Sequence, residues 1–90
     1  MADSDPSTEF SVVVVSPDEV LFEDSAIKIM APGIEQEIAI LPDHTPLYAE
    51  LIKGTIVITK TDESEKEFPI ESAILRVKQN RVSIILGFKP

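Results

Sequence analysis

Cysteine is absent from this 90-residue chain, and histidine occurs only once, at His44. Without cysteine the chain can form neither a disulfide nor a thiolate metal site, which is consistent with a reducing compartment. A Ser-His-Asp triad would have a single possible base, and cysteine nucleophiles are excluded. There is neither a glycine-rich phosphate loop nor a two-histidine metal motif. The sequence therefore predicts no catalytic residue, no cofactor and no metal, and a chain that is not itself an enzyme.

Basic residues and long apolar runs are also scarce. The chain has eight lysines and arginines and sixteen acidic residues, which gives a net charge of −8. This charge repels phosphate backbones and anionic lipid, so we expect no nucleic-acid partner and no direct lipid binding. No apolar run reaches the roughly 18 residues that span a bilayer. The acidic start Met1-Ala2-Asp3-Ser4-Asp5 is unlike a signal peptide, so we expect a soluble, cytoplasmic chain.

The residues that are abundant favour an all-β domain. Hydrophobic residues make up 43% of the chain, which is ordinary for a globular domain. We expect a flexible acidic tail over residues 1–9 and one β-sandwich domain over residues 10–90. Apolar residues keep helical spacing for no more than two turns anywhere, so the sequence predicts no long helix. Nine short runs rich in Val, Ile, Thr and Phe predict strands at Phe10–Val15, Val20–Glu23, Ala26–Ala31, Glu37–Leu41, Leu47–Ile52, Thr55–Thr61, Lys66–Ile70, Ala73–Lys78 and Arg81–Leu86.

Three local features refine this prediction. Pro69 lies inside a strand-like run, so that strand is expected at an edge or at a bulge. Asn80 accepts a left-handed conformation, which suits the turn between the last two strands. The acidic segment from Asp62 to Glu67 lacks the spacing of a calcium loop and is interpreted as a solvated hairpin tip.

Two predicted strands, over Val12–Val15 and Ile84–Leu86, have apolar residues on both of their faces. In each strand, the alternate residues of one parity point to one face and fill the core. The residues of the other parity point to the opposite face and must contact something else. A second layer of the same domain can cover that face, or single valines can face water. Alternatively, the second parity forms an outer face that docks on another protein, because monomers rarely expose a wide apolar patch.

The segment from Pro32 to Leu47 carries a resemblance to a known family. It reads Pro-Gly-Ile-Glu-Gln-Glu-Ile-Ala-Ile-Leu-Pro-Asp-His-Thr-Pro-Leu. It resembles the signature of ATP synthase epsilon subunits, roughly Pro-Gly-x-x-Gly-Glu-hydrophobic-Gly-Ile-Leu-Pro-x-His-x-Pro-Leu. The runs Val15–Phe22, Ile74–Val77 and Asn80–Ile84 are similar to the family's opening and closing strands, so the likeness extends from about residue 10 to residue 86.

Several glycines of the family pattern are replaced in this chain. Gln36 and Ala39 stand at two of them, Asp43 stands where glycine often precedes the histidine, and Ser72-Ala73 replace a Gly-Gly pair. Where such a glycine adopts φ > 0, its loss costs stability or changes the loop; where it is merely small, the change is tolerated.

The resemblance implies a sandwich of about ten strands, of the epsilon N-terminal type, at the foot of the central stalk of an F-type ATP synthase. Its expected partners are the gamma subunit and the c-ring, on the cytoplasmic side of the energy-coupling membrane, and the isolated domain is expected to be monomeric. The helical hairpin of most relatives would begin where this sequence ends, at Phe88-Lys89-Pro90, so we expect it to be missing here.

The resemblance and the two-parity strands together give the expected contact residues. The expected c-ring contacts are Ile34, Glu35, Gln36 and Glu37, and the expected gamma contacts are Pro42, His44, Pro46, Val13, Val15 and Ile85. For His44, a turn residue hydrogen-bonded to nearby backbone is an equally good interpretation. The alternative function is an acidic β-sandwich that binds a ligand or a protein outside any motor; a concave apolar pocket would favour it.

Overall fold

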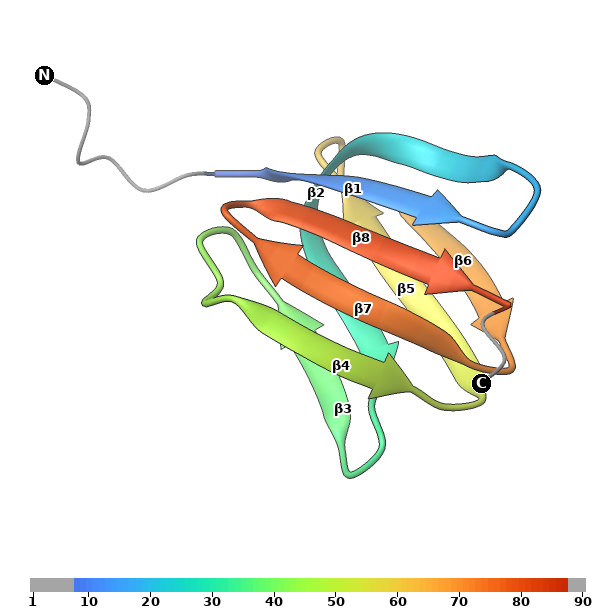
Figure 1. Cartoon of the computed structure of the whole chain (residues 1–90). Helices are drawn as coiled ribbons and strands as arrows, with labels where there is room; N and C mark the ends of the chain where they lie inside the picture. Colours follow the sequence, from blue (N-terminus) through green and yellow to red (C-terminus); the bar gives the residue numbers. More distant parts are fainter. Residues whose placement is uncertain (1–7, 88–90) are drawn as a thin grey trace, which may run out of the picture.

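Residues 8–87 are described by a computed structural model, in which they form eight β-strands and no helix (Figure 1). The expected tail lies almost wholly outside the described residues, as do residues 88–90. None of the described residues belongs to a helix long and apolar enough to cross a membrane. The strands are β1 (Phe10–Val15), β2 (Val20–Pro32), β3 (Glu37–Ile40), β4 (Leu47–Leu51), β5 (Gly54–Lys60), β6 (Glu65–Ile70), β7 (Ala73–Lys78) and β8 (Arg81–Leu86).

β2 takes part in both layers of the fold. Its first half pairs antiparallel with β1, and its second half pairs with β3 on one side and β5 on the other. A shift in register against β5 lies between Ala26 and Lys28, where β2 changes partners. The expected break at Asp24-Ser25 is wrong, because these polar residues are held extended opposite Val12 and Ser11. Two predicted strands are therefore one, and the expectation of about ten strands is corrected to eight.

The strands form two facing layers (Figure 1). The hydrogen-bonded order is β4-β7-β8-β1-β2-β5-β6, with β3 paired to β2. β1 and β8 run parallel, and the other neighbours are antiparallel. The front layer in Figure 1 is β4-β7-β8-β1, and the back layer contains β3, β5, β6 and the second half of β2. The described chain is thus a β-sandwich, as the sequence predicts.

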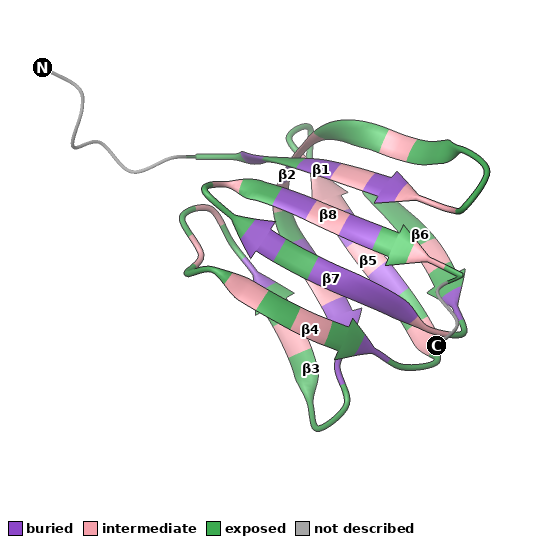
Figure 2. Ribbon diagram, viewed as in Figure 1, coloured by how far each residue is buried: buried purple, intermediate pink, exposed green. Residues whose placement is uncertain are grey.

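Buried and more exposed residues alternate along the strands of both layers (Figure 2), and the buried ones form the core. In β5 the predicted alternation is confirmed, since Ile56 and Ile58 have no exposed surface while Val57 and Thr59 are half-buried. Phe22 and Phe68 meet edge to face, with ring centroids 5.9 Å apart, and pack against the edge of the core. The completely buried large residues come from both layers: Ile29, Ile40, Ile56, Ile58, Leu75, Ile84, Val12, Val14 and Val82.

The turn between β7 and β8 has the conformation expected for a two-residue hairpin. Gln79 and Asn80 have φ values of 50° and 58°, and a turn with both central residues at positive φ matches the twist of the strands. The Asn80 side chain also reaches the β3–β4 loop. There it accepts a hydrogen bond from the Asp43 N–H at 2.6 Å and donates one to the Asp43 carboxylate at 2.9 Å.

Asp43 is the one replaced glycine that stands at positive φ, with a value of 63°. Gln36, Ala39, Ser72 and Ala73 do not lie in this region. Those four positions therefore require only a side chain that the surroundings accept. Asp tolerates the left-handed conformation better than most residues, and its two bonds to Asn80 hold it there.

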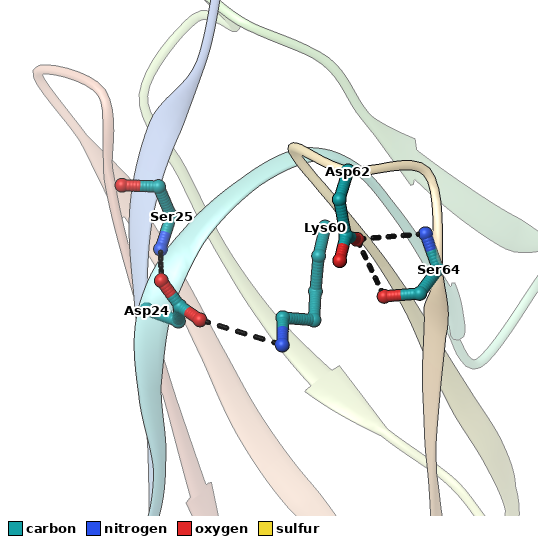
Figure 3. A network of polar contacts seen from close by, with 5 residues as sticks. All are labelled: Asp24, Ser25, Lys60, Asp62 and Ser64. Carbon is teal, nitrogen blue, oxygen red and sulfur yellow. Dashed lines mark hydrogen bonds and ion pairs between the residues drawn. The ribbon is translucent and has the colours of Figure 1, made fainter.

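The hairpin between β5 and β6 carries the acidic tip (Figure 3). Asp62 accepts hydrogen bonds from the Ser64 hydroxyl at 2.5 Å and from the Ser64 N–H at 2.9 Å, and these bonds lower the pKa of the Asp62 carboxyl. Lys60 pairs with Asp24 of β2 at 3.6 Å. β6 pairs only with β5, so Pro69 lies on an edge strand as predicted.

We predict that Asp43→Ala lowers the free energy of unfolding by about 1–3 kcal/mol, because alanine tolerates the positive φ poorly and removes the carboxylate that accepts a hydrogen bond from the Asn80 amide. Asp43→Gly should lose less, since glycine adopts this φ without strain. Urea unfolding of both variants measures the difference. Equal losses would show that the backbone conformation contributes nothing and that the side-chain bonds account for the whole effect.

We also predict a pH-dependent contribution from Asp62. Because its folded pKa lies below the usual 3.8, the ionised form stabilises the fold above that pH. The contribution disappears as the pH falls through the folded pKa. In urea unfolding, wild type and Asp62→Asn should therefore differ at pH 5, and the difference should shrink as the pH falls below 3.8. A difference that stays constant across this range would contradict the assignment.

Candidate interaction surfaces

The outer face of the front layer carries a continuous run of apolar side chains. Val15 lies between Val20 of β2 and Ile85 of β8, and Ile85 lies beside Ile74 of β7. We call these four residues the apolar row. Val20 is 57% exposed and Ile85 41% exposed, whereas Val15 is half-buried and Ile74 is buried. The row crosses four strands without an intervening polar residue.

The two-parity strands place one parity in the core and the other on the outer face. Val12, Val14 and Ile84 are the buried parity. Val15 and Ile85 are the other parity and adjoin, as expected. Val13 departs from the expectation: it is half-buried and stands between Ser83 and Glu23, so it lies outside the apolar row.

A second row on the same face contains Tyr48, which is not among the contact residues expected from the sequence. Tyr48 of β4 is 69% exposed and lies opposite Arg76 of β7. An open depression of about 340 Å³ lies on these two paired strands and is also lined by Pro46 and Lys78. Tyr48 could have been found from the alternation of Leu47, Ala49 and Leu51, which leaves its side chain on the other face.

His44 lies in the β3–β4 loop and contacts its own backbone. Its N–H donates to the Leu41 carbonyl oxygen at 3.2 Å, and its Nδ1 lies 2.7 Å from the Thr45 carbonyl oxygen, as a donor to it. This confirms the turn interpretation of His44. The bonds between Asp43 and Asn80 fix the loop to the β7–β8 turn, so Pro46 leads directly onto the outer face beside Tyr48.

Residues Ile34–Glu37 form the tip of the hairpin between β2 and β3. All four are exposed, with Ile34 at 62%, and the hairpin lies at the lower edge of the molecule in Figure 1. A Cβ at Gly33 would come within 2.6 Å of the Gln36 carbonyl oxygen, so this tight tip requires glycine. Leu51 bridges to Gly33, which ties the base of the tip to the end of β4.

The expected contact residues therefore form three separate surfaces. The Ile34–Glu37 tip and the His44 loop stand at opposite ends of β3. The apolar row lies on the front layer, at the end of β1 away from Asn80, which bonds to the β1 start through the Ser11 N–H. The structure does not bring them into one pocket.

The chemistry of these surfaces suits contacts with proteins. An open depression of about 530 Å³ crosses β2, β1 and β8; besides three valines its lining is polar: Ser11, Glu23, Asp24, Ser25, Arg81 and Ser83. It is not the concave apolar pocket that a ligand-binding module would need. Within residues 8–87, no group of three or more His, Asp or Glu side chains could hold a metal ion.

Comparison with known proteins gives a consistent match. Residues 9–87 match the family model of the ATP synthase delta/epsilon chain β-sandwich domain. The ATP synthase epsilon chain of Dichelobacter nodosus is 39% identical over 81 residues, which cover 90% of this chain and 56% of that one. The epsilon chain of Bordetella avium is 36% identical over 74 residues, which cover 82% and 52%. This chain thus spans about half the length of these relatives.

Solved structures show the same fold at low sequence identity. A chain of the Euglena gracilis mitochondrial ATP synthase structure, described as OSCP/F1/c-ring, superposes with a TM-score of 0.85 at 16% identity, covering 93% of this chain and 54% of that one. A chain of the Tetrahymena thermophila central stalk and c-ring structure superposes with a TM-score of 0.70 at 16% identity, covering 84% and 61%. The family match covers nearly every described residue, and the sandwich agrees with it. The chain belongs to the family of ATP synthase delta/epsilon chain β-sandwich domains.

Proposed function

We propose that this chain is a non-catalytic central-stalk subunit of a proton-translocating F-type ATP synthase, which binds the gamma subunit, contacts the c-ring and helps to couple rotation to ATP synthesis. Its family supports the proposal, and so do the epsilon chains that resemble it. The proposed location is the cytoplasmic side of the energy-coupling membrane. A chain of charge −8 would be held there by its protein partners, because anionic lipid repels it.

The apolar row is the observation that carries this proposal. Val20 and Ile85 expose large parts of their side chains on a face whose opposite side already fills the core. Monomeric proteins rarely present such a row to water, and protein interfaces place one at their centre. We therefore assign the apolar row to the gamma interface.

The His44 loop extends the same interface. The prolines Pro42 and Pro46 restrict their own φ angles, and the bonds between Asp43 and Asn80 fix the loop to the sandwich. A preordered loop loses little conformational entropy on binding. Since Pro46 borders the outer face beside Tyr48, gamma could contact the loop and that face together.

The Ile34–Glu37 tip is proposed as the c-ring contact. It lies apart from the outer face, so one surface is free for gamma while another meets the ring. Its short length and the tight turn at Gly33 suit a contact that must transmit force without folding away. Glu37 begins β3 and is paired with Pro32, so its backbone is held by the sheet.

We predict that the double variant Val15→Ser/Ile85→Ser binds gamma roughly tenfold more weakly, because it removes apolar contacts from the centre of the interface. Its unfolding free energy should fall by less than about 1 kcal/mol, since neither side chain belongs to the core. Titration calorimetry and urea unfolding measure the two effects.

Two further variants control this experiment. Val57→Ser makes a similar change at a half-buried side chain of β5, on the face of the back layer opposite to Ile56 and Ile58, and gamma binding should be unaltered. Val14→Ser replaces a completely buried side chain and should destabilise the fold strongly. If the double variant loses as much stability as Val14→Ser, both parities are core and the interface assignment fails.

We predict that Glu37→Lys partly impairs ATP-driven proton pumping in a reconstituted ATP synthase. An exposed charge pair contributes at most about 1 kcal/mol, so the defect should be partial and should shrink at high salt. Glu67→Lys, on the exposed side of β6, makes the same change in charge away from the tip and serves as the control. Equal pumping by wild type and Glu37→Lys would remove Glu37 from the contact.

A further inference from the structure

Three of the chain's eight basic residues gather at one end of the outer face. Arg76 and Lys78 of β7 and Arg81 of β8 are all exposed and lie next to the β7–β8 turn. All three have the parity of Ile74 and Ile85, so they share the face of the apolar row. We call these three cations the basic corner.

The fold gains nothing from placing cations here. Lys78 lies directly opposite Arg81 in the antiparallel pair, and like charges at opposed positions destabilise a sheet. Among the residues that the structure describes, no carboxylate lies within 4.0 Å of any of the three. Lys60, in contrast, is paired with Asp24. A chain with twice as many acidic as basic residues thus has, on one surface, three cations that form no ion pair with any residue from 8 to 87.

The basic corner is also concave and bordered by an aromatic side chain. One open depression, of about 270 Å³, is lined by the three cations together with Gln79 and Ser83. The depression on the paired strands β4 and β7, which Tyr48 borders, adjoins the basic corner because both depressions are lined by Arg76 and Lys78. Exposed tyrosine and arginine side chains are enriched where protein partners bind most strongly.

The corner is continuous with the apolar row. Arg76 follows Ile74 by two residues on β7, and Ser83 precedes Ile85 by two residues on β8, which corresponds to a distance of roughly 7 Å along the strands. A partner that covers Ile74 and Ile85 therefore reaches the basic corner as well. A nucleic acid or an anionic lipid surface is extended and would also meet the surrounding carboxylates, which repel it. A protein segment can place its charges at the corner alone.

We propose that the basic corner binds carboxylate side chains of an acidic segment on the partner protein that covers the apolar row. This inference rests on the proposed function, in which that partner is gamma, and it adds the charge of the segment that gamma presents here. The apolar row supplies contact area, while the corner fixes the orientation in which the partner docks, because a reversed orientation would place its acidic segment against carboxylates such as Glu23.

The single variant Arg81→Glu separates stability from binding. It replaces the like-charged pair of Lys78 and Arg81 with a pair of opposite charges, so the midpoint of thermal unfolding should rise by about 2–4 °C. Binding to gamma should weaken roughly three- to tenfold at 50 mM salt and recover toward the wild-type value at 500 mM. The double variant Lys78→Glu/Arg81→Glu restores a like-charged pair; its stability should return to near wild type while its binding weakens further.

Lys28→Glu is the matched control, because Lys28 is exposed on β2 and the variant makes the same change in net charge. It should bind gamma within twofold of wild type. If Lys28→Glu weakens binding as much as Arg81→Glu, general repulsion explains the loss and the basic corner is overturned. If Arg81→Glu binds normally while Val15→Ser/Ile85→Ser binds weakly, the basic corner is wrong and the gamma interface stands. If both bind normally, the gamma interface fails and the basic corner with it.

Discussion

The pairing of β2 with both layers is the interaction on which the rest of the fold depends. A single 13-residue strand pairs with β1 in one half and with β3 and β5 in the other. Because every backbone N–H and C=O in the sheet needs a partner, the change of neighbours must occur where the ladder shifts register, between Ala26 and Lys28. The back layer reaches β1 through this strand, and the hairpin tip with Glu37 extends from its end.

The same constraint separates the two proposed interfaces. β2 carries the Ile34–Glu37 tip away from the front layer, while the β1–β8 pair turns its second apolar parity outward. A sandwich of this kind can contact two partners at once, because its core needs only one face of each layer. The outer faces are then available for recognition, provided that the loops at their borders are held. The bonds between Asp43 and Asn80 do this for the His44 loop.

The outer face joins two kinds of contact that act differently. The apolar row offers buried area, which is strong but carries little directional information. The basic corner offers three cations without described partners, which add little affinity in water but discriminate between orientations and partners. Lys78 and Arg81 lie at opposed positions of a strand pair, where like charges oppose folding, and a requirement of recognition explains this placement.

Local physical chemistry let the sequence determine most of the strands and the turns, while the family was identified by the resemblance of residues 32–47 to a known signature. Alternation identified the core side of β5, Pro69 marked an edge strand, and Asn80 marked a left-handed turn, because each depends on neighbours along the chain. The continuity of β2 could not be foreseen, since Asp24 and Ser25 break the local pattern and only pairing with β1 keeps them extended. The apolar row, the role of Tyr48 and the basic corner were likewise decided by tertiary structure. Each is assembled from different strands, and the register between strands is set by long-range hydrogen bonds that no single stretch of sequence contains.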